Sequence, residues 1–161
     1  MPEPLLLPEL ARSLRSFGAP RDAAGDAAHA AIFAPLLDAR ARAGLGDVDA
    51  ALSALRGGTL AARIASRVAQ AASAGHADPA HARASAARAS ELLEPLVAAL
   101  RTLDALAAAA RDGSLHSPAW DAWVLQLRRV FAHADDACRA LARMLAEPSA
   151  APKPARRWFG R

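Results

Sequence analysis

Apolar residues recur every three or four positions along most of this chain, and glycine and proline interrupt the pattern at intervals. This spacing places apolar side chains on one face of an α-helix. No stretch shows the strict apolar–polar alternation that is typical of a β-strand. The pattern therefore predicts an all-α protein, an up-and-down helical bundle of four main helices plus one or two short ones, with a flexible C-terminal tail.

Four helices are expected in the first half of the chain. Their expected extents are a short helix at 8–17, a helix at 22–43, a brief helix at 47–56 and a helix at 59–74. The apolar side chains that share one face of the first are Leu7, Leu10, Leu14 and Phe17. Pro35 should kink or split the second, because its ring removes a backbone donor and clashes with the preceding turn. Gly57-Gly58 should end the third, and Thr59 should cap the fourth.

Two long helices are expected in the second half. Asp78-Pro79 and Ser117-Pro118 both read as an N-cap residue followed by proline at the first helical position. The first helix should reach Gly113 and bend at Pro95, and its first half offers only alanine on its apolar stripe. The second should end at Pro148. Because the connection between the two is short, they should run antiparallel.

The last helix carries the most regular heptad pattern in the sequence. The expected a and d positions are Trp120, Val124, Leu127, Phe131, Ala134, Cys138, Leu141 and Leu145. A third apolar column stands beside them, at Trp123, Val130, Ala137 and Met144. A face this wide must contact more than one neighbour, so we expect this helix to be central in the bundle.

The charge pattern divides the chain in two. The net charge is +4, and all 16 acidic residues precede Pro148, where an equal number of basic residues balances them. The excess therefore lies in the final segment. We expect a helical bundle domain at 1–147 and a Pro/Ala spacer with a cationic-aromatic tail at 148–161.

The tail is the main functional prediction of the sequence. Its candidate partner-binding residues are Lys153, Arg156, Arg157, Trp158, Phe159 and Arg161. Trp, Phe and Arg are the residue types that anchor protein interfaces. The tail therefore favours a non-enzymatic interaction or scaffold protein that docks on a larger protein assembly. An alternative is contact with an anionic membrane surface, where the rings would lie among headgroups and the cations would attract lipid.

A second set of cationic residues suggests another class of function. Candidate nucleic-acid contacts at helical spacing are Arg56, Arg63, Arg67, Arg83 and Arg88. Such a stripe could neutralise phosphates in a salt-dependent way that does not depend on base sequence. Lys153 is the only lysine among the 20 cationic side chains, a bias that a GC-rich bacterial genome also explains.

No pattern of residues indicates an enzyme, a metal site or a cofactor. The segments around His76 and His133 contain some metal-ligand types, but one acid is needed as a helix cap and the others diverge around a helix. A third class, a small helical enzyme or phosphocarrier, would be indicated by bound metal or by acid-labile phosphate on His81. The solitary Cys138 excludes an internal disulfide, and no stretch resembles a signal peptide, so we expect a cytoplasmic protein.

Alanine makes up roughly three residues in ten, far above ordinary usage. It is the best helix former, but its side chain buries little area. A core of this kind is thin, and a partner or a second copy of the chain could complete it.

Overall fold

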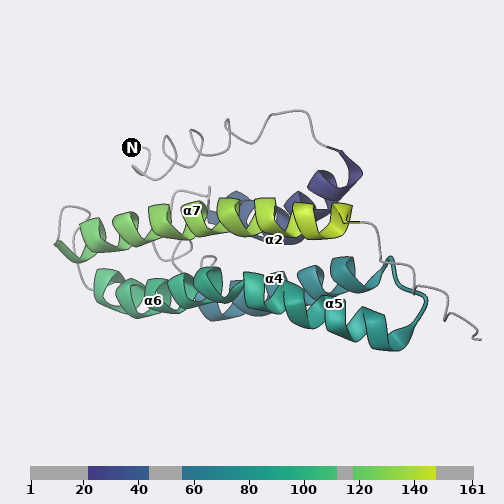
Figure 1. Cartoon of the computed structure of the whole chain (residues 1–161). Helices are drawn as coiled ribbons and strands as arrows, with labels where there is room; N and C mark the ends of the chain where they lie inside the picture. Colours follow the sequence, from purple (N-terminus) through teal and green to yellow (C-terminus); the bar gives the residue numbers. More distant parts are fainter. Residues whose placement is uncertain (1–21, 44–55, 112–117, 148–161) are drawn as a thin grey trace, which may run out of the picture.

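The computed structural model describes residues 22–43, 56–111 and 118–147. These residues form five α-helices and no β-strand, which confirms the all-α class (Figure 1). The helices are α2 (Ala23–Ala43), α4 (Gly57–Ser73), α5 (Pro79–Leu92), α6 (Glu94–Arg111) and α7 (Pro118–Ala146). The helices expected at 8–17 and 47–56, and the C-terminal tail, lie outside the described residues.

Helix α2 is apolar on nearly all sides. Ala31, Ile32 and Phe33 are consecutive and all buried, so the buried arc spans at least about 200° of the helix. A helix of this kind is typical of a position between several neighbours, and α2 packs on both α7 and α4. The expected split at Pro35 is wrong, because this buried residue lies inside a continuous helix. Packing on two sides offsets the lost backbone hydrogen bond there.

Helix α4 begins two residues earlier than expected. Its N-cap is Arg56, whose side chain makes no capping hydrogen bond, and Gly57 and Gly58 lie in the first turn. The Gly58 amide N–H donates to Oδ2 of Asp104, which belongs to α6, at 2.7 Å. A carboxylate from another helix thus satisfies a first-turn N–H, so no local cap at Thr59 is required. A Cβ at position 58 would lie 3.3 Å from the same carboxylate oxygen, which favours glycine there.

The expected long helix at 78–112 is divided into α5 and α6 at one residue, Leu93. Pro95 has no N–H to donate, and the Leu93 N–H instead makes a tight-turn bond to the Ser90 carbonyl. The bend expected at Pro95 is therefore a break between two helices. Ala89 is the one buried residue of α5, in agreement with its alanine-only stripe. By contrast, α6 buries several leucines, including Leu96, Leu100 and Leu103.

Helix α7 shows that the expected heptad register was wrong by one column. The continuous buried seam is Trp120, Trp123, Leu127, Val130, Ala134, Ala137, Leu141 and Met144. The expected a column, Val124, Phe131, Cys138 and Leu145, includes three residues that are only half-buried. The two choices share the column of Trp120, Leu127, Ala134 and Leu141, and their second columns lie about 100° apart around the helix. The sequence leaves both open because both columns are apolar, and the neighbouring helices select one.

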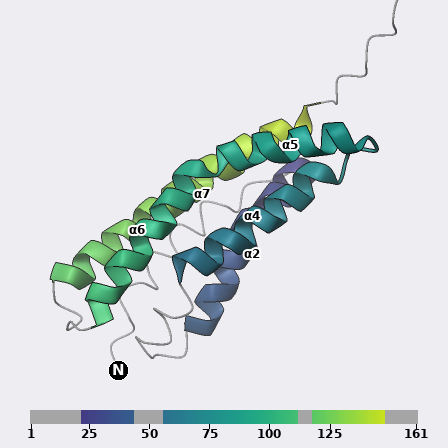
Figure 2. The same cartoon turned by 90° about the horizontal axis from the view of Figure 1, so that it is seen from below.

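The helices enclose one apolar core. Helix α7 packs on α6 and α2, and α4 packs on α2, α6 and α5. Helices α6 and α7 lie side by side and run in opposite directions, as expected (Figure 1). Helix α5 continues the line of α6 and contacts α7 only sparsely (Figure 2). The polar Gln126 side chain is buried between α7 and α6, where its Nε2 donates to the Ala99 carbonyl at 3.0 Å.

The seam assignment predicts different costs for two identical substitutions on α7. Val130→Ala should lower the free energy of unfolding by about 2 kcal/mol, because Val130 is fully buried and its truncation leaves a cavity. Val124→Ala should cost less than about half of that, because Val124 is half-buried. Urea denaturation followed by circular dichroism measures both. Equal costs, or a larger cost at Val124, would contradict the assigned seam.

Candidate interaction surface

The six candidate partner-binding residues of the tail lie outside the described residues, but the point where the tail leaves the bundle is described. The Glu147 N–H donates to the Arg143 carbonyl at 3.1 Å, which extends the last turn of α7. The Glu147 carboxylate accepts a hydrogen bond from Nη1 of Arg88 in α5, at 3.0 Å. This ion pair ties the end of α7 to a helix that otherwise touches α7 only sparsely.

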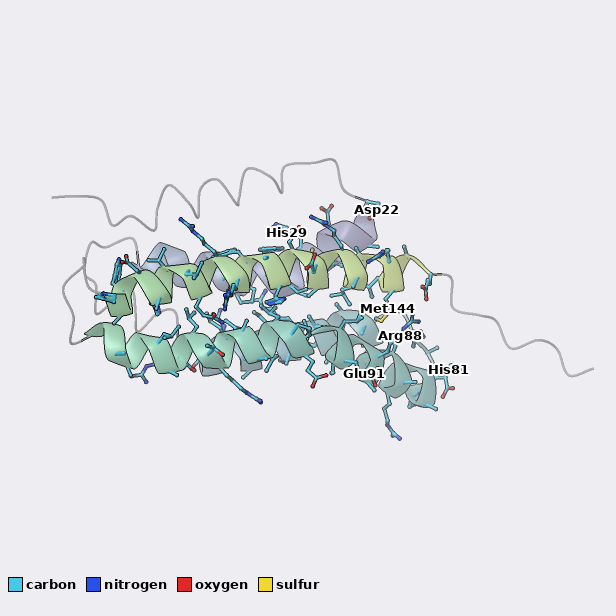
Figure 3. The ribbon with its side chains drawn as sticks, turned by 60° about the vertical axis from the view of Figure 1, so that its left-hand side comes forward. Asp22, His29, His81, Arg88, Glu91 and Met144 are labelled. Carbon is cyan, nitrogen blue, oxygen red and sulfur yellow. The ribbon has the colours of Figure 1, made fainter. Side chains whose placement is uncertain are left out.

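Three helices meet at this end of the molecule. Asp22 at the start of α2, Met144 near the end of α7 and Arg88 of α5 all lie there (Figure 3). We call it the C-terminal pole and define it by these three residues and Glu147. The sequence places several arginines at or near this pole, and two of them form ion pairs. Arg88 pairs with Glu147, and Arg139 pairs with Asp135 one turn away on α7. The pole is therefore less cationic than its count of arginines suggests.

The candidate nucleic-acid residues lie on α4 and α5 and at the residue before α4. Arg56, Arg67 and Arg83 are exposed, whereas Arg63 is half-buried and takes part in a further interaction. Arg88 is exposed but engaged with Glu147. Helices α4 and α5 pack on each other. Helix α4 contains arginine and no acidic residue, so this hairpin carries a local excess of positive charge.

Asp78 and His81 form a local pair at the start of α5. Asp78 is the N-cap, as expected, and its Oδ1 accepts from the Ala80 N–H at 3.1 Å. Its Oδ2 accepts from Nδ1 of His81 at 2.5 Å. The Ala80 N–H first, and His81 second, hold the pKa of Asp78 below its usual range. Among the residues that the structure describes, no three His, Cys, Asp or Glu side chains come close enough to hold a metal ion.

Trp120 and Trp123 form part of the core. Their ring centroids are 5.1 Å apart with an interplanar angle of 26°, and both side chains are buried. Among the described residues, no acceptor lies within hydrogen-bond distance of the Nε1–H of Trp123. Both rings were expected in the apolar columns of this helix, and their stacking and burial are those of packed side chains.

Three residues in these contacts were not identified from the sequence as interacting groups: Asp104, Gln126 and Glu147. Each makes a hydrogen bond to a residue at least 27 positions away. Local spacing carries no signal for such contacts. Gln126 offered a partial signal, because it is a polar residue beside the apolar stripe of α7.

Comparisons of this chain with models of protein families, with characterised proteins and with solved structures found no match. Within the described residues, no helix combines the length and the apolar character needed to cross a membrane.

The Asp78–His81 pair predicts a pH-dependent contribution to stability. Asn is as good an N-cap as Asp but cannot ionise, so Asp78→Asn keeps the bond to Ala80 and removes the charge. Because the folded-state pKa of Asp78 is lowered, its stabilisation is present above the unfolded value and is lost as the pH falls through the folded one. We expect the wild-type protein to melt roughly 1–3 °C above Asp78→Asn at pH 5. The two should melt together near pH 2.

Asp136→Asn is the matched control, because Asp136 is an exposed acid in the middle of α7. Circular dichroism measures the melting temperatures of the wild type and both variants between pH 2 and pH 6. A difference between wild type and Asp78→Asn that does not shrink at low pH would contradict the assignment.

Proposed function

We propose that this protein is a non-enzymatic interaction or scaffold protein, an up-and-down bundle that docks on a larger protein assembly through its C-terminal Arg-Trp-Phe peptide. The observation that carries the proposal is the segregation of charge. The body is electrically balanced, while the final 14 residues contain Lys153, Arg156, Arg157 and Arg161 and no acid. The proposal places the protein in the cytoplasm, where a solitary cysteine would remain reduced.

The chemistry of the tail specifies the kind of surface that it fits. Trp158 and Phe159 can fill an apolar pocket, and the flanking arginines can form bidentate contacts with carboxylates at its rim. The proline-rich spacer at 148–155 resists helix formation and can extend about 3 Å per residue, or roughly 25 Å in all. The peptide can therefore reach a partner without contact between the partner and the bundle.

The position at which the tail leaves the bundle supports this arrangement. Glu147, the last described residue before the spacer, pairs with Arg88 at the C-terminal pole. The exposed ion pair contributes on the order of 0–1 kcal/mol to stability.

Deletion of residues 153–161 tests the docking proposal. We expect the deletion to abolish co-purification with the partner from the native host, as read by mass spectrometry. Helicity and the melting temperature should be unchanged, because the deleted residues lie outside the bundle domain. Retention of the partner by the truncated protein would contradict the proposal.

Two full-length variants show which chemistry binds. Trp158→Ala with Phe159→Ala removes the rings, and Arg156→Gln with Arg157→Gln removes the paired charges. Loss of the protein partner with the first pair supports pocket docking. If the intact chain instead binds anionic phospholipid vesicles without a protein partner and loses this binding in both double variants, that result would assign the tail to a membrane surface and overturn docking on a protein.

A nucleic-acid-associated bundle is the second candidate function, and one observation favours it. Arg56, Arg67 and Arg83 are all exposed on or beside the α4–α5 hairpin, which carries excess positive charge. The α4–α5 face would contact phosphates without reading bases. The partially engaged Arg63 and Arg88 would contribute less.

A salt-titrated mobility-shift assay on random-sequence DNA tests the second candidate. Binding should weaken as salt rises. The double replacement Arg67→Gln with Arg83→Gln should reduce the slope of log binding constant against log salt concentration by about 2 in magnitude. The tail deletion serves as the matched control, since it removes positive charge from another part of the chain. No binding by the intact protein at low salt would exclude this function.

A further inference from the structure

Helix α7 presents a second apolar column that its described neighbours cover only in part. Its members are Val124, Phe131, Cys138 and Leu145, each separated from the next by two helical turns. Only Phe131 is buried, and the other three are half-buried. Along the adjacent seam every residue is at least nine-tenths buried. The apolar face of α7 is therefore wider than the core against which it packs.

The side of α7 that carries this column can be identified from Gln126. This side chain bonds to Ala99 of α6, so α6 lies on the Gln126 side of the seam. Around the axis of α7, Phe131 lies about 40° from Leu127 in one direction, and Gln126 lies about 100° from Leu127 in the opposite direction. The column therefore lies on the side away from α6. Because α2 is the other described helix that packs extensively on α7, the column runs along the boundary between α7 and α2.

The chain itself supplies an occupant of matching period. Residues 8–17 lie outside the described residues, and their sequence predicts an amphipathic helix whose apolar face is formed by Leu7, Leu10, Leu14 and Phe17. These positions follow a three–four–three spacing, which is the spacing of a heptad seam. A helix of ten residues is about 15 Å long, and one interval of the column is about 10 Å. The segment can therefore cover the column from Leu145 to Cys138.

The point of attachment favours this segment over any other occupant. Asp22, the first described residue of α2, lies at the same end of the molecule as Met144, the neighbour of Leu145 (Figure 3). Four residues separate Phe17 from Asp22, so the predicted helix is tethered beside the column. A tether this short raises the effective concentration of the segment to the millimolar range or above. A second copy of the chain, or a separate partner helix, would have to compete with that concentration.

We propose that residues 7–17 dock as an amphipathic helix on the part of this column formed by Cys138 and Leu145, at the boundary between α7 and α2. The docked helix runs in the same direction as α7, with Phe17 near Leu145 and Leu10 near Cys138. It completes a core that alanine leaves thin. The inference is independent of the docking role proposed for the C-terminal tail.

Cys138, the solitary cysteine of the chain, lies in the column, so the accessibility of its thiol shows whether the column is covered. In the full-length protein, Leu10→Glu with Leu14→Glu should release the segment and raise the alkylation rate of Cys138 about threefold or more, since thiol reactivity follows exposure. Arg12→Glu with Ser16→Glu is the matched control, because these positions lie on the opposite, polar face of the predicted helix. An unchanged rate in the first variant, or an equal rise in the control, would overturn the proposal.

A cross-linking variant identifies the occupant without depending on destabilisation. Leu10→Cys should form a disulfide with Cys138 under mild oxidation, whereas Arg12→Cys, on the opposite face of the predicted helix, should form it at least several-fold more slowly. The cross-linked product should migrate as a monomer on a non-reducing gel, and peptide mass spectrometry should show the 10–138 link. A disulfide-linked dimer would assign the column to a second copy. Failure of the 10–138 link to form faster than the 12–138 link would refute the placement.

Discussion

Small side chains set the main constraint on this protein, because alanine forms helices readily but buries little apolar area. The helices must therefore pack closely around a few large residues. Trp123 is the largest of the fully buried side chains. Burial of such a ring removes about 150–250 Å² from water, which corresponds to about 4–6 kcal/mol. The seam of α7 that contains it contacts α6 on one side and α2 on the other.

Contacts between helices also satisfy polar groups that local structure leaves unpaired. The Asp104 carboxylate of α6 accepts a bond from the first turn of α4, and the Gln126 amide bridges α7 to α6. Both fix how one helix is placed on another. A thin apolar core permits several registers of similar energy, and directional hydrogen bonds favour one of them. The Arg88–Glu147 ion pair has a comparable role at the surface, where it joins α5 to the end of α7.

Folding and binding are divided between different parts of this chain in our proposal. The bundle has balanced charge and buries its large apolar residues, whereas the tail concentrates cations beside two aromatic rings. An unbalanced segment of this composition cannot form a core of its own. In the proposal, these rings and guanidinium groups bind a partner, and the peptide extends from the C-terminal pole.

The sequence by itself determined the helices, because periodicity, N-caps and prolines act over a few residues. Asp78-Pro79 begins α5, Pro118 begins α7 and Pro95 marks the break before α6, as the local chemistry of each requires. The tail residues were also identified from sequence, but the contacts that position its base were not. The structure leaves the binding role of the tail as a prediction.

The tertiary structure decided what depends on distant residues. The seam of α7 was one such feature, because two adjacent apolar columns fit the heptad equally well and only the placement of α6 and α2 distinguishes Val130 from Val124. The start of α4 was another, since the carboxylate that receives its N–H is 46 residues away. The continuity of α2 through Pro35 was a third. In each case the local preference was weak compared with packing or hydrogen bonding that the folded chain brings together.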